Sequence, residues 1–440
     1  MDHLITLYID PGTGGMLFTI LFGIFGVAVF SIRALMLKIK YRASGGKSAR
    51  INDQKLPIVI FTDHKRYWNV FEPLLDEFEK RQQKVLYYTC SEDDPIFKKK
   101  YDHVTGEFIG EGNKAFSRLN LLNASVVVSS TPSLDVFQWK RSKNVDFYIH
   151  LLHAANEITL YRMFGTDHYD AIFVSGEYQV KQIRQLEELR GIPPRETPFC
   201  GIPYLDALKK RLDAAGPVPA HDRTVLLASS WGAGSILSRF GEKLIDPLIA
   251  TGYKVIVRPH PQSFNAEKDM IDRLMSKYND ESQVEWNRDN DNFEVLRRSD
   301  ILISDFSGII FDYTLVFDKP LIYTETNYVL DPYDASWLEE KPWTFGILPE
   351  MGIELNDGNV ADVKELIDKC IEDPTFSKGR DKARAETWVP MGNGAELAVD
   401  YIIKKYHETI EKRKADEEAA EKASKQSKKK TAGKRSRVSK

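Results

Sequence analysis

The chain has 440 residues, of which 42% are hydrophobic and 11% aromatic, enough to fill the cores of two or three domains. Its net charge is −3, but residues 422–440 hold nine Lys or Arg and no acid, so the preceding residues carry −12. An acidic folded part argues against a nucleic-acid-binding protein. The three cysteines, Cys90, Cys200 and Cys370, fit neither a disulfide framework nor a zinc site and favour a reducing compartment.

Residues 11–32 form an uncharged stretch that predicts a membrane-spanning helix. This stretch, PGTGGMLFTILFGIFGVAVFSI, would extend about 33 Å as a helix, enough for a hydrocarbon core of about 30 Å. Two Asp and no Lys or Arg precede it, whereas six Lys or Arg follow between 33 and 50. The positive-inside rule therefore puts the N-terminus outside and the rest of the chain in the cytoplasm. We expect a single-pass anchor in the cytoplasmic membrane over 1–42, its helix at about 13–35. A buried core helix is the alternative.

Beyond a polar linker at 43–55, β-rich runs alternate with amphipathic stretches, which is typical of βα units and parallel sheets. The alternation pauses at an Ala-, Gly- and Pro-rich segment near 212–223 and then restarts. We expect an α/β protein with two doubly wound, Rossmann-like domains facing a cleft. The predicted parts are an N-terminal domain at 56–210, a C-terminal domain at 222–395, a helix at 396–421 that closes the second domain, and a disordered basic tail at 422–440. The tail would either hold the protein to anionic lipid or only solubilise it.

Ligands of open α/β sheets bind at the carboxyl ends of the strands, so polar residues directly after predicted strands are candidates for a site. The run VIVRPHP (255–261) puts Arg258 and His260 after one strand, with flanking prolines that stiffen the turn. An arginine and a histidine fixed there suit a diphosphate or a developing phosphate charge. A salt-bridged arginine with a surface histidine is the alternative.

A second strand opens into ISDFSG (303–308), which offers Ser304, Asp305, Ser307 and Gly308. We expect Ser307 to cap a helix that begins near Gly308, where free N–H groups and the helix dipole attract an anion. Asp312, one turn further on, is a candidate for a ribose hydroxyl. An ordinary helix start with an exposed acid is the alternative.

Two further strand ends complete the predicted site. The run LASSWG (227–232) places Ser229 and Ser230 at a third strand end of the second half, and these hydroxyls suit a loop over phosphates. In the first half, YIHLLHAANE (148–157) offers His150 and His153 as general bases. If that strand reaches 153, the two rings point to opposite faces and at most one faces the cleft. A plain turn and structural histidines are the alternatives.

The motif RPHP, followed about 45 residues later by SDFSGIIFDYTLVFDKPLIY, resembles the donor-site signature of the CDP-glycerol glycerophosphotransferases of teichoic acid synthesis. The resemblance is good over about 222–330 and fainter over about 120–205. It implies a GT-B-type fold and transfer of a polyol phosphate from a CDP-activated donor to a hydroxyl, with release of CMP. It also implies that Arg258 and His260 lie beside the donor phosphates, that Ser307 and Gly308 lie under the diphosphate, and that Asp312 matches the acid of the family's FDY.

The family's first-domain histidine lies in a His-Gly pair, whereas the matching place here reads His153-Ala154, with His150 nearby. We expect His153 or His150 to deprotonate the acceptor and His260 to assist at the donor. The expected partners are a CDP-polyol, a lipid-linked glycan or polyol-phosphate acceptor, and the membrane. No Cys/His cluster is present, and we expect no metal or other cofactor. The alternatives are a GT-B glycosyltransferase that uses a nucleotide sugar and a degenerate, non-catalytic scaffold for envelope assembly.

Overall fold

The computed structural model describes residues 55–155, 157–289, 291–305, 307–324 and 330–438. The predicted anchor at 1–42 and all but the last residue of the linker at 43–55 lie outside these residues. Among the residues that are described, we find no helix with the length and hydrophobicity needed to span a bilayer.

The first half is built on one parallel sheet with the strand order β3-β2-β1-β4-β5-β6. Its strands are β1 (Leu56–Thr62), β2 (Val85–Thr89), β3 (Val104–Phe108), β4 (Ala124–Ser129), β5 (Val145–His150) and β6 (Ala171–Ile172). Its helices are η1 (Lys65–Tyr67), α2 (Trp68–Lys80), η2 (Pro95–Lys98), α3 (Gly112–Leu119), η3 (Ile158–Leu160) and α4 (Glu177–Arg190). The sequence runs continuously apolar through β1 and β4 because both faces of these strands are covered.

The second half repeats this arrangement with the order β12-β11-β10-β7-β8-β9. Its strands are β7 (Thr224–Ala228), β8 (Lys254–Arg258), β9 (Val284–Trp286), β10 (Ile301–Ser304), β11 (Leu321–Thr324) and β12 (Gly352–Leu355). Its helices are α5 (Pro203–Ala214), α6 (Ile236–Arg239), α7 (Glu242–Ala250), α8 (Ser263–Ala266), α9 (Lys268–Lys277), α10 (Phe293–Arg298), α11 (Ile309–Phe311), η4 (Asp312–Val316), η5 (Asp334–Trp337), α12 (Trp343–Met351), η6 (Val360–Asp362), α13 (Val363–Glu372) and α14 (Thr375–Thr387).

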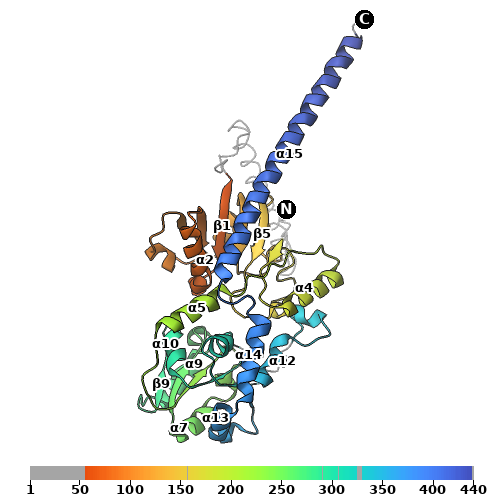
Figure 1. Ribbon diagram of the computed structural model, residues 1–440. Coiled ribbons are helices and arrows are strands. Elements are labelled where there is room, and N and C mark those ends of the chain that lie inside the picture. The colour runs from red at the N-terminus through yellow and green to blue at the C-terminus, as the bar shows by residue number, and fades with distance from the viewer. Residues whose placement is uncertain (1–54, 156, 290, 306, 325–329, 439–440) are drawn as a thin grey trace, which may run out of the picture. The chain divides into compact units, whose positions relative to one another are not determined.

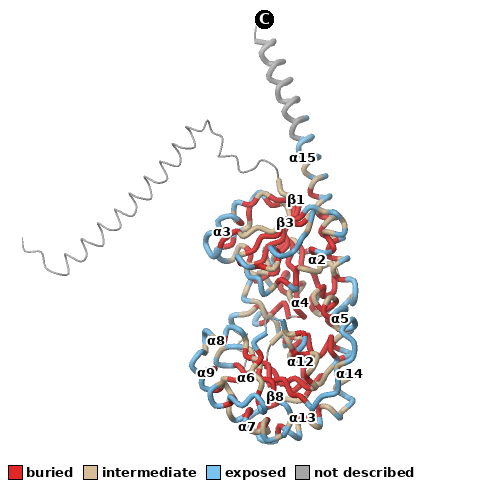
Figure 2. Tube along the Cα trace, turned by 90° about the vertical axis from the view of Figure 1, so that its left-hand side faces the viewer, coloured by how far each residue is buried: buried red, intermediate tan, exposed pale blue. Residues whose placement is uncertain are grey.

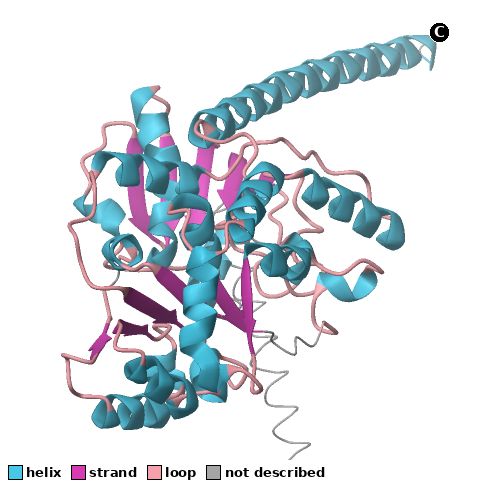
Figure 3. Cartoon of the chain, turned by 60° about the horizontal axis from the view of Figure 1, so that its bottom comes forward, coloured by secondary structure: helices cyan, strands magenta, loops and turns pink. Residues whose placement is uncertain are grey.

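Both sheets therefore have the doubly wound order, which reverses direction between β1 and β4 in one and between β7 and β10 in the other. Helices flank both sheets (Figure 3), and buried residues concentrate along the strands of each (Figure 2). The register pairs Leu302 of β10 with Leu226 of β7, and each of these side chains is fully buried. The predicted site residues of the second half follow β7, β8 and β10, so the fold brings them to one edge of one sheet.

The last helix, α15 (Gly394–Val438), belongs to the first half and not to the second. Ala398, Val399 and Ile402 pack in the same core as Ile58 and Phe71, so the prediction that this helix closes the second domain is wrong. The second domain is closed by α14, which packs against α12. The helix also continues to Val438, through the stretch for which a disordered tail was expected (Figure 1).

The two halves are joined by backbone and side-chain contacts between the segment after β5 and the segment around η5. The N–H of Asp334 donates to the carbonyl of Tyr161 (3.0 Å), and the N–H of Thr344 donates to the carboxylate of Glu157 (3.2 Å). Arg190 donates to the Asp334 carboxylate at 2.5 Å, and both side chains are buried. These contacts fix the segment that carries His153 against the second half.

Candidate active site

Arg258 and His260 occupy the end of β8 as predicted, and neighbouring groups fix their orientation. The Arg258 guanidinium donates to the side-chain oxygen of Asn287 and to the carbonyl of Asp289 (2.8 Å), and burial lowers the pKa of Arg258. The Nδ1 atom of His260 accepts the N–H of Gln262 (3.0 Å). A neutral His260 must then carry its proton on Nε2, so it can donate a hydrogen bond to an anion.

Ser304 and Asp305 lie beneath the site and hold it together. The Ser304 hydroxyl donates to the carbonyl of Ala228 (2.7 Å), which ties β10 to β7. The Asp305 carboxylate accepts the N–H of Ser230 (2.9 and 3.1 Å to its two oxygens) and the N–H of Ile236 (2.8 Å). Ser304 and Asp305 are 0% and 1% exposed. They thus brace the β7–α6 loop, whereas the sequence predicted that they bind the donor directly.

The two serines after β7 differ in what they can offer a ligand. Ser229 is buried, and its hydroxyl donates to the carbonyl of Ser230 (2.8 Å), so this side chain shapes the loop. Ser230 is partly exposed, with its backbone N–H held by Asp305. Trp231 follows with 54% of its surface exposed, on a loop that Asp305 fixes at two points.

The helix after β10 starts differently from the prediction. Its N-cap is Gly308, without a side-chain capping bond, and Ser307 contributes only its carbonyl, which accepts the N–H of Ile310 (3.1 Å). The expectation that the Ser307 hydroxyl caps the helix is therefore wrong. Both Ser307 and Gly308 are partly exposed, which suits their predicted place under a diphosphate.

Asp312 does not present its carboxylate at the sheet edge. It is 6% exposed and accepts the hydroxyl of Tyr204 on α5 (2.9 Å), and burial raises its pKa to about 7. The contact fastens α5 to the start of η4. The geometry gives no support to the predicted ribose contact.

The two candidate bases lie on either side of one tyrosine hydroxyl. β5 ends at His150, which is completely buried, and the chain turns before it reaches His153, which is partly exposed. The hydroxyl of Tyr161 is 3.4 Å from Nε2 of His150 and 3.4 Å from Nδ1 of His153. Burial lowers the pKa of His150 to about 3 and that of His153 to about 4, so both are neutral near pH 7. Exposure favours His153 as the base, with His150 behind it.

Sequence reasoning missed Tyr161 and also Arg66, which lies in the loop after β1. The charge of Arg66 lowers the pKa of His153 in the first half and of His260 in the second, in each case after the larger effect of burial. The charge of one residue thus acts on a candidate base and on a candidate donor ligand. The signal was present, because TDHKRY (62–67) places charged residues directly after an apolar strand.

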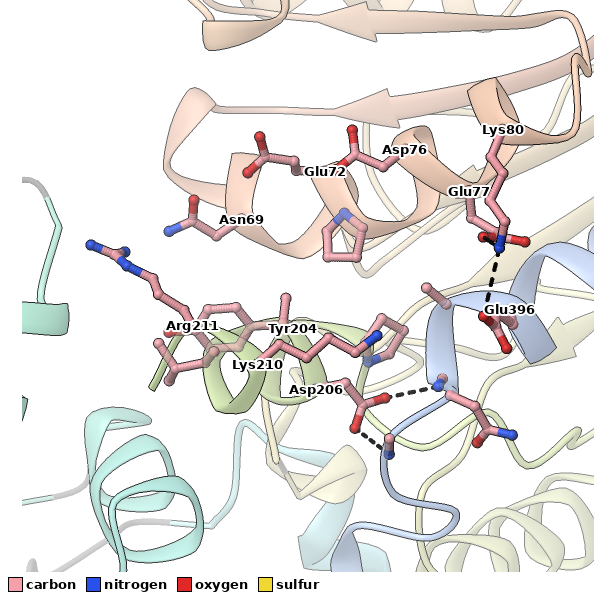
Figure 4. A pocket seen from close by; sticks show the side chains of 18 of the residues that line it. Asn69, Glu72, Asp76, Glu77, Lys80, Tyr204, Asp206, Lys210, Arg211 and Glu396 are labelled. Atoms are coloured by element: carbon pink, nitrogen blue, oxygen red, sulfur yellow. Dashed lines mark hydrogen bonds and ion pairs between the residues drawn. The ribbon is translucent and has the colours of Figure 1, made fainter. Parts of the chain in front are cut away.

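A cavity of about 400 Å³ lies beside this region, between α2, α5 and the start of α15 (Figure 4). Six acids and three bases line it, and Asp206 in its wall accepts the N–H groups of Gly392 (2.6 Å) and Gly394 (2.8 Å). None of the predicted site residues lines the cavity. Tyr204 and Asn292, which both line the cavity, connect it to Asp312 through side-chain hydrogen bonds.

A family model described as CDP-glycerol:poly(glycerophosphate) glycerophosphotransferase matches residues 49–336. The chain belongs to this family. A search of curated proteins gives no match. The match spans β1 to η5 and includes every predicted site residue, so the site belongs to the part of the chain that defines the family.

Solved structures with the same fold are distant in sequence. A putative UDP-N-acetylglucosamine 2-epimerase from Listeria monocytogenes is 13% identical with a TM-score of 0.54, over 81% of this chain and 98% of that one. The MnaA–UDP structure from S. aureus is 13% identical with a TM-score of 0.53, over the same shares. The UDP-GlcNAc 2-epimerase of Methanocaldococcus jannaschii is 13% identical with a TM-score of 0.51, over 76% and 99%. These similarities establish a GT-B-like fold for this transferase-family chain.

Proposed function

We propose that this glycerophosphotransferase-family protein moves a polyol phosphate from a CDP-activated donor to a hydroxyl of a lipid-linked acceptor. The observation that supports the proposal is that Arg258 and His260 stand at the end of β8, at the same sheet edge as the ends of β7 and β10, in a chain of this family. A base and a donor ligand are needed on opposite sides of a transferred phosphorus atom. Arg258, two residues before His260 in the sequence, supplies a cation for the donor phosphates.

In the proposed reaction, His153 accepts the proton of the acceptor hydroxyl. The acceptor oxygen forms a bond to the β-phosphorus, the bond from that phosphorus to the bridging oxygen breaks, and CMP leaves with that oxygen. Arg258 and the Nε2–H of His260 stabilise the charge on the phosphate oxygens. With a pKa of about 4, His153 is neutral near pH 7 and can accept the acceptor's proton. It then passes that proton to water and returns to its neutral form.

Purified full-length protein in detergent, supplied with CDP-glycerol or CDP-ribitol and a lipid-linked acceptor, tests this proposal by release of CMP. We expect His153→Asn to reduce CMP release by about 100-fold or more, the range for loss of a general base. His221→Asn, a change of an exposed histidine, is the matched control and leaves the rate unchanged. We also propose that no metal takes part, so EDTA should leave the rate unchanged, and a loss that Mg²⁺ restores contradicts this point.

The first alternative is a GT-B glycosyltransferase, which the UDP complex with the same fold keeps open. Release of UDP or UMP from nucleotide sugars, with none of CMP from CDP-polyols, would decide for it. The second is a non-catalytic scaffold. Cells in which His153→Asn and Arg258→Gln both support normal envelope assembly would decide for that role.

We further propose that the protein is held at the cytoplasmic membrane by its N-terminal segment, with both α/β halves on the cytoplasmic side. The uncharged run at 11–32 and the Lys and Arg residues that follow it support this orientation. In intact cells, we expect a membrane-impermeant thiol reagent to label a cysteine introduced at residue 5. We expect a cysteine introduced in place of Asp222 to be protected. The reverse pattern contradicts the orientation.

A further inference from the structure

The loop between β1 and α2 holds a cation at the carboxyl edge of the first sheet. The loop is fixed by its own hydrogen bonds, since the Thr62 hydroxyl donates to the carbonyl of His64 (3.0 Å) and the N–H of Lys65 donates to the hydroxyl of Ser91 (3.0 Å). The N–H of Arg66 donates to Nδ1 of His64 (3.1 Å). The backbone position of Arg66 is therefore determined before any ligand binds.

The Arg66 side chain is exposed and lies over the ring of Tyr67, with 5.0 Å from the guanidinium carbon to the ring centroid. Among the described residues, no carboxylate lies within ion-pair distance of it, whereas the neighbouring Lys65 is paired with Asp93. The Tyr67 ring packs edge-on against the ring of His153, with 5.2 Å between centroids. Arg66, Tyr67 and His153 thus form one contiguous group.

The helix that follows adds to the positive potential of this loop. α2 has 13 residues and begins at Trp68, two residues after Arg66, and its first turn contains no acid. A helix N-terminus carries a partial positive charge, and the acid before it, Asp63, lies three residues ahead of Arg66 and acts electrostatically on Tyr67, the N-cap of α2. The charge of Arg66 also reaches His260, on the opposite half of the molecule. An anion bound near Arg66 would lie beside Tyr67 and His153, the candidate base.

We propose that Arg66 is a catalytic residue that binds the β-phosphate of the donor, the phosphate that is transferred. This inference rests on the proposed function, and it adds a phosphate ligand from the first half to those on the second. A guanidinium is suited to the task because its fork of N–H groups matches two phosphate oxygens and stays charged throughout the reaction. The acceptor oxygen approaches the phosphorus from the side of His153, next to Arg66.

Two ligands differ in the phosphate that Arg66 is proposed to bind. CDP-glycerol contains the β-phosphate and CMP does not, so Arg66 should matter for binding of the first and not of the second. Arg258 and His260, on the second half, are proposed to lie near the diphosphate. Their replacement should weaken the binding of CDP-glycerol and of CMP more evenly.

The test uses the full-length protein with Arg66→Gln, Arg66→Lys and the control Lys65→Gln, which removes one positive charge from the same loop. We expect Arg66→Gln to weaken CDP-glycerol binding by about 10-fold or more, to change CMP binding by less than about twofold, and to lower turnover by about 100-fold. Arg66→Lys should recover part of the turnover, and Lys65→Gln should match the wild type.

Equal weakening of CMP and CDP-glycerol binding by Arg66→Gln would overturn the proposal, as would an unchanged turnover in a wild-type enzyme that releases CMP. Failure of the wild type to release CMP from any CDP-polyol would instead overturn the proposed function. Because Arg66 is exposed, the variants should unfold at the same temperature as the wild type. If Arg66→Gln unfolds at a lower temperature and binds CDP-glycerol and CMP equally more weakly, the residue has a structural role and the proposal is wrong.

Discussion

Replacement of Asp305 by alanine tests whether this residue supports the site or binds the donor. Its carboxylate accepts two buried or half-buried backbone N–H groups, those of Ser230 and Ile236. Hydrogen bonds to a charged group contribute about 1.5–3 kcal/mol each, so the loss of both would cost about 3–6 kcal/mol. The N–H of Ser230 can regain a water because this residue is partly exposed, and we therefore expect about 3–4 kcal/mol.

Thermal unfolding of the full-length protein in detergent measures this effect. For a unit the size of the second half, a loss of about 3 kcal/mol corresponds to a fall in Tm of roughly 6–12 °C. Asp305→Asn retains one acceptor oxygen and should show about half of the shift. Asp222→Ala removes an exposed acid before β7 and serves as the control, with a change in stability of at most about 0.5 kcal/mol. Wild-type Tm combined with lost donor binding in Asp305→Ala would show that Asp305 is a direct ligand and refute this reasoning.

Three further predictions follow from the histidines and the last helix. Tyr161→Phe should fold normally and lower turnover about 10-fold, because His153 loses the hydroxyl that orients its Nδ1, and an unchanged rate argues against this role. Burial lowers the pKa of His150 to about 3, so its neutral form contributes stability that is complete above about pH 6.5 and is lost as the pH falls towards 3. Because the raised pKa of Asp312 acts in the opposite direction over this range, the readout is a comparison of two proteins: the Tm advantage of the wild type over His150→Asn should shrink below about pH 6.5, and an advantage that stays constant down to pH 4 contradicts this. Truncation at residue 421 should weaken binding to anionic vesicles in low salt and leave it unchanged in high salt, whereas equal binding of both forms at low salt indicates a solubilising tail.

The sequence predicted the two α/β halves because the strands are short, apolar and separated by turns, as in VLLA before Ser229 and ILI before Ser304. The sequence located the strand ends, and it thereby identified Arg258, His260 and His153 as candidate site residues. It assigned Ser304, Asp305 and Asp312 to the ligand because polar residues at a strand end are visible in a sequence. Their hydrogen-bond partners, such as the N–H groups that bind the Asp305 carboxylate, come from other segments of the chain and cannot be read from the sequence.

The same limit explains what was missed. The last helix was expected to close the second domain, although the last helix of a GT-B fold often crosses back to the first, and Ala398 and Ile402 do pack in the core of the first half. Arg66 was overlooked because the charged run TDHKRY after β1, although visible in the sequence, matches no motif of the family named above. Its significance depends on Tyr67 packing against His153, a contact between residues 86 positions apart in the chain.

The ion pair between Arg190 and Asp334 has a consequence for how substrates enter. Both side chains are buried, and separating them would strand a charge away from water, at a cost of about 3–5 kcal/mol. We expect the two halves to stay joined at this point through a catalytic cycle, the more so because α2 also contacts α5 and α4 contacts α14. An acceptor of the proposed kind would then have to reach the site without the molecule opening at this point.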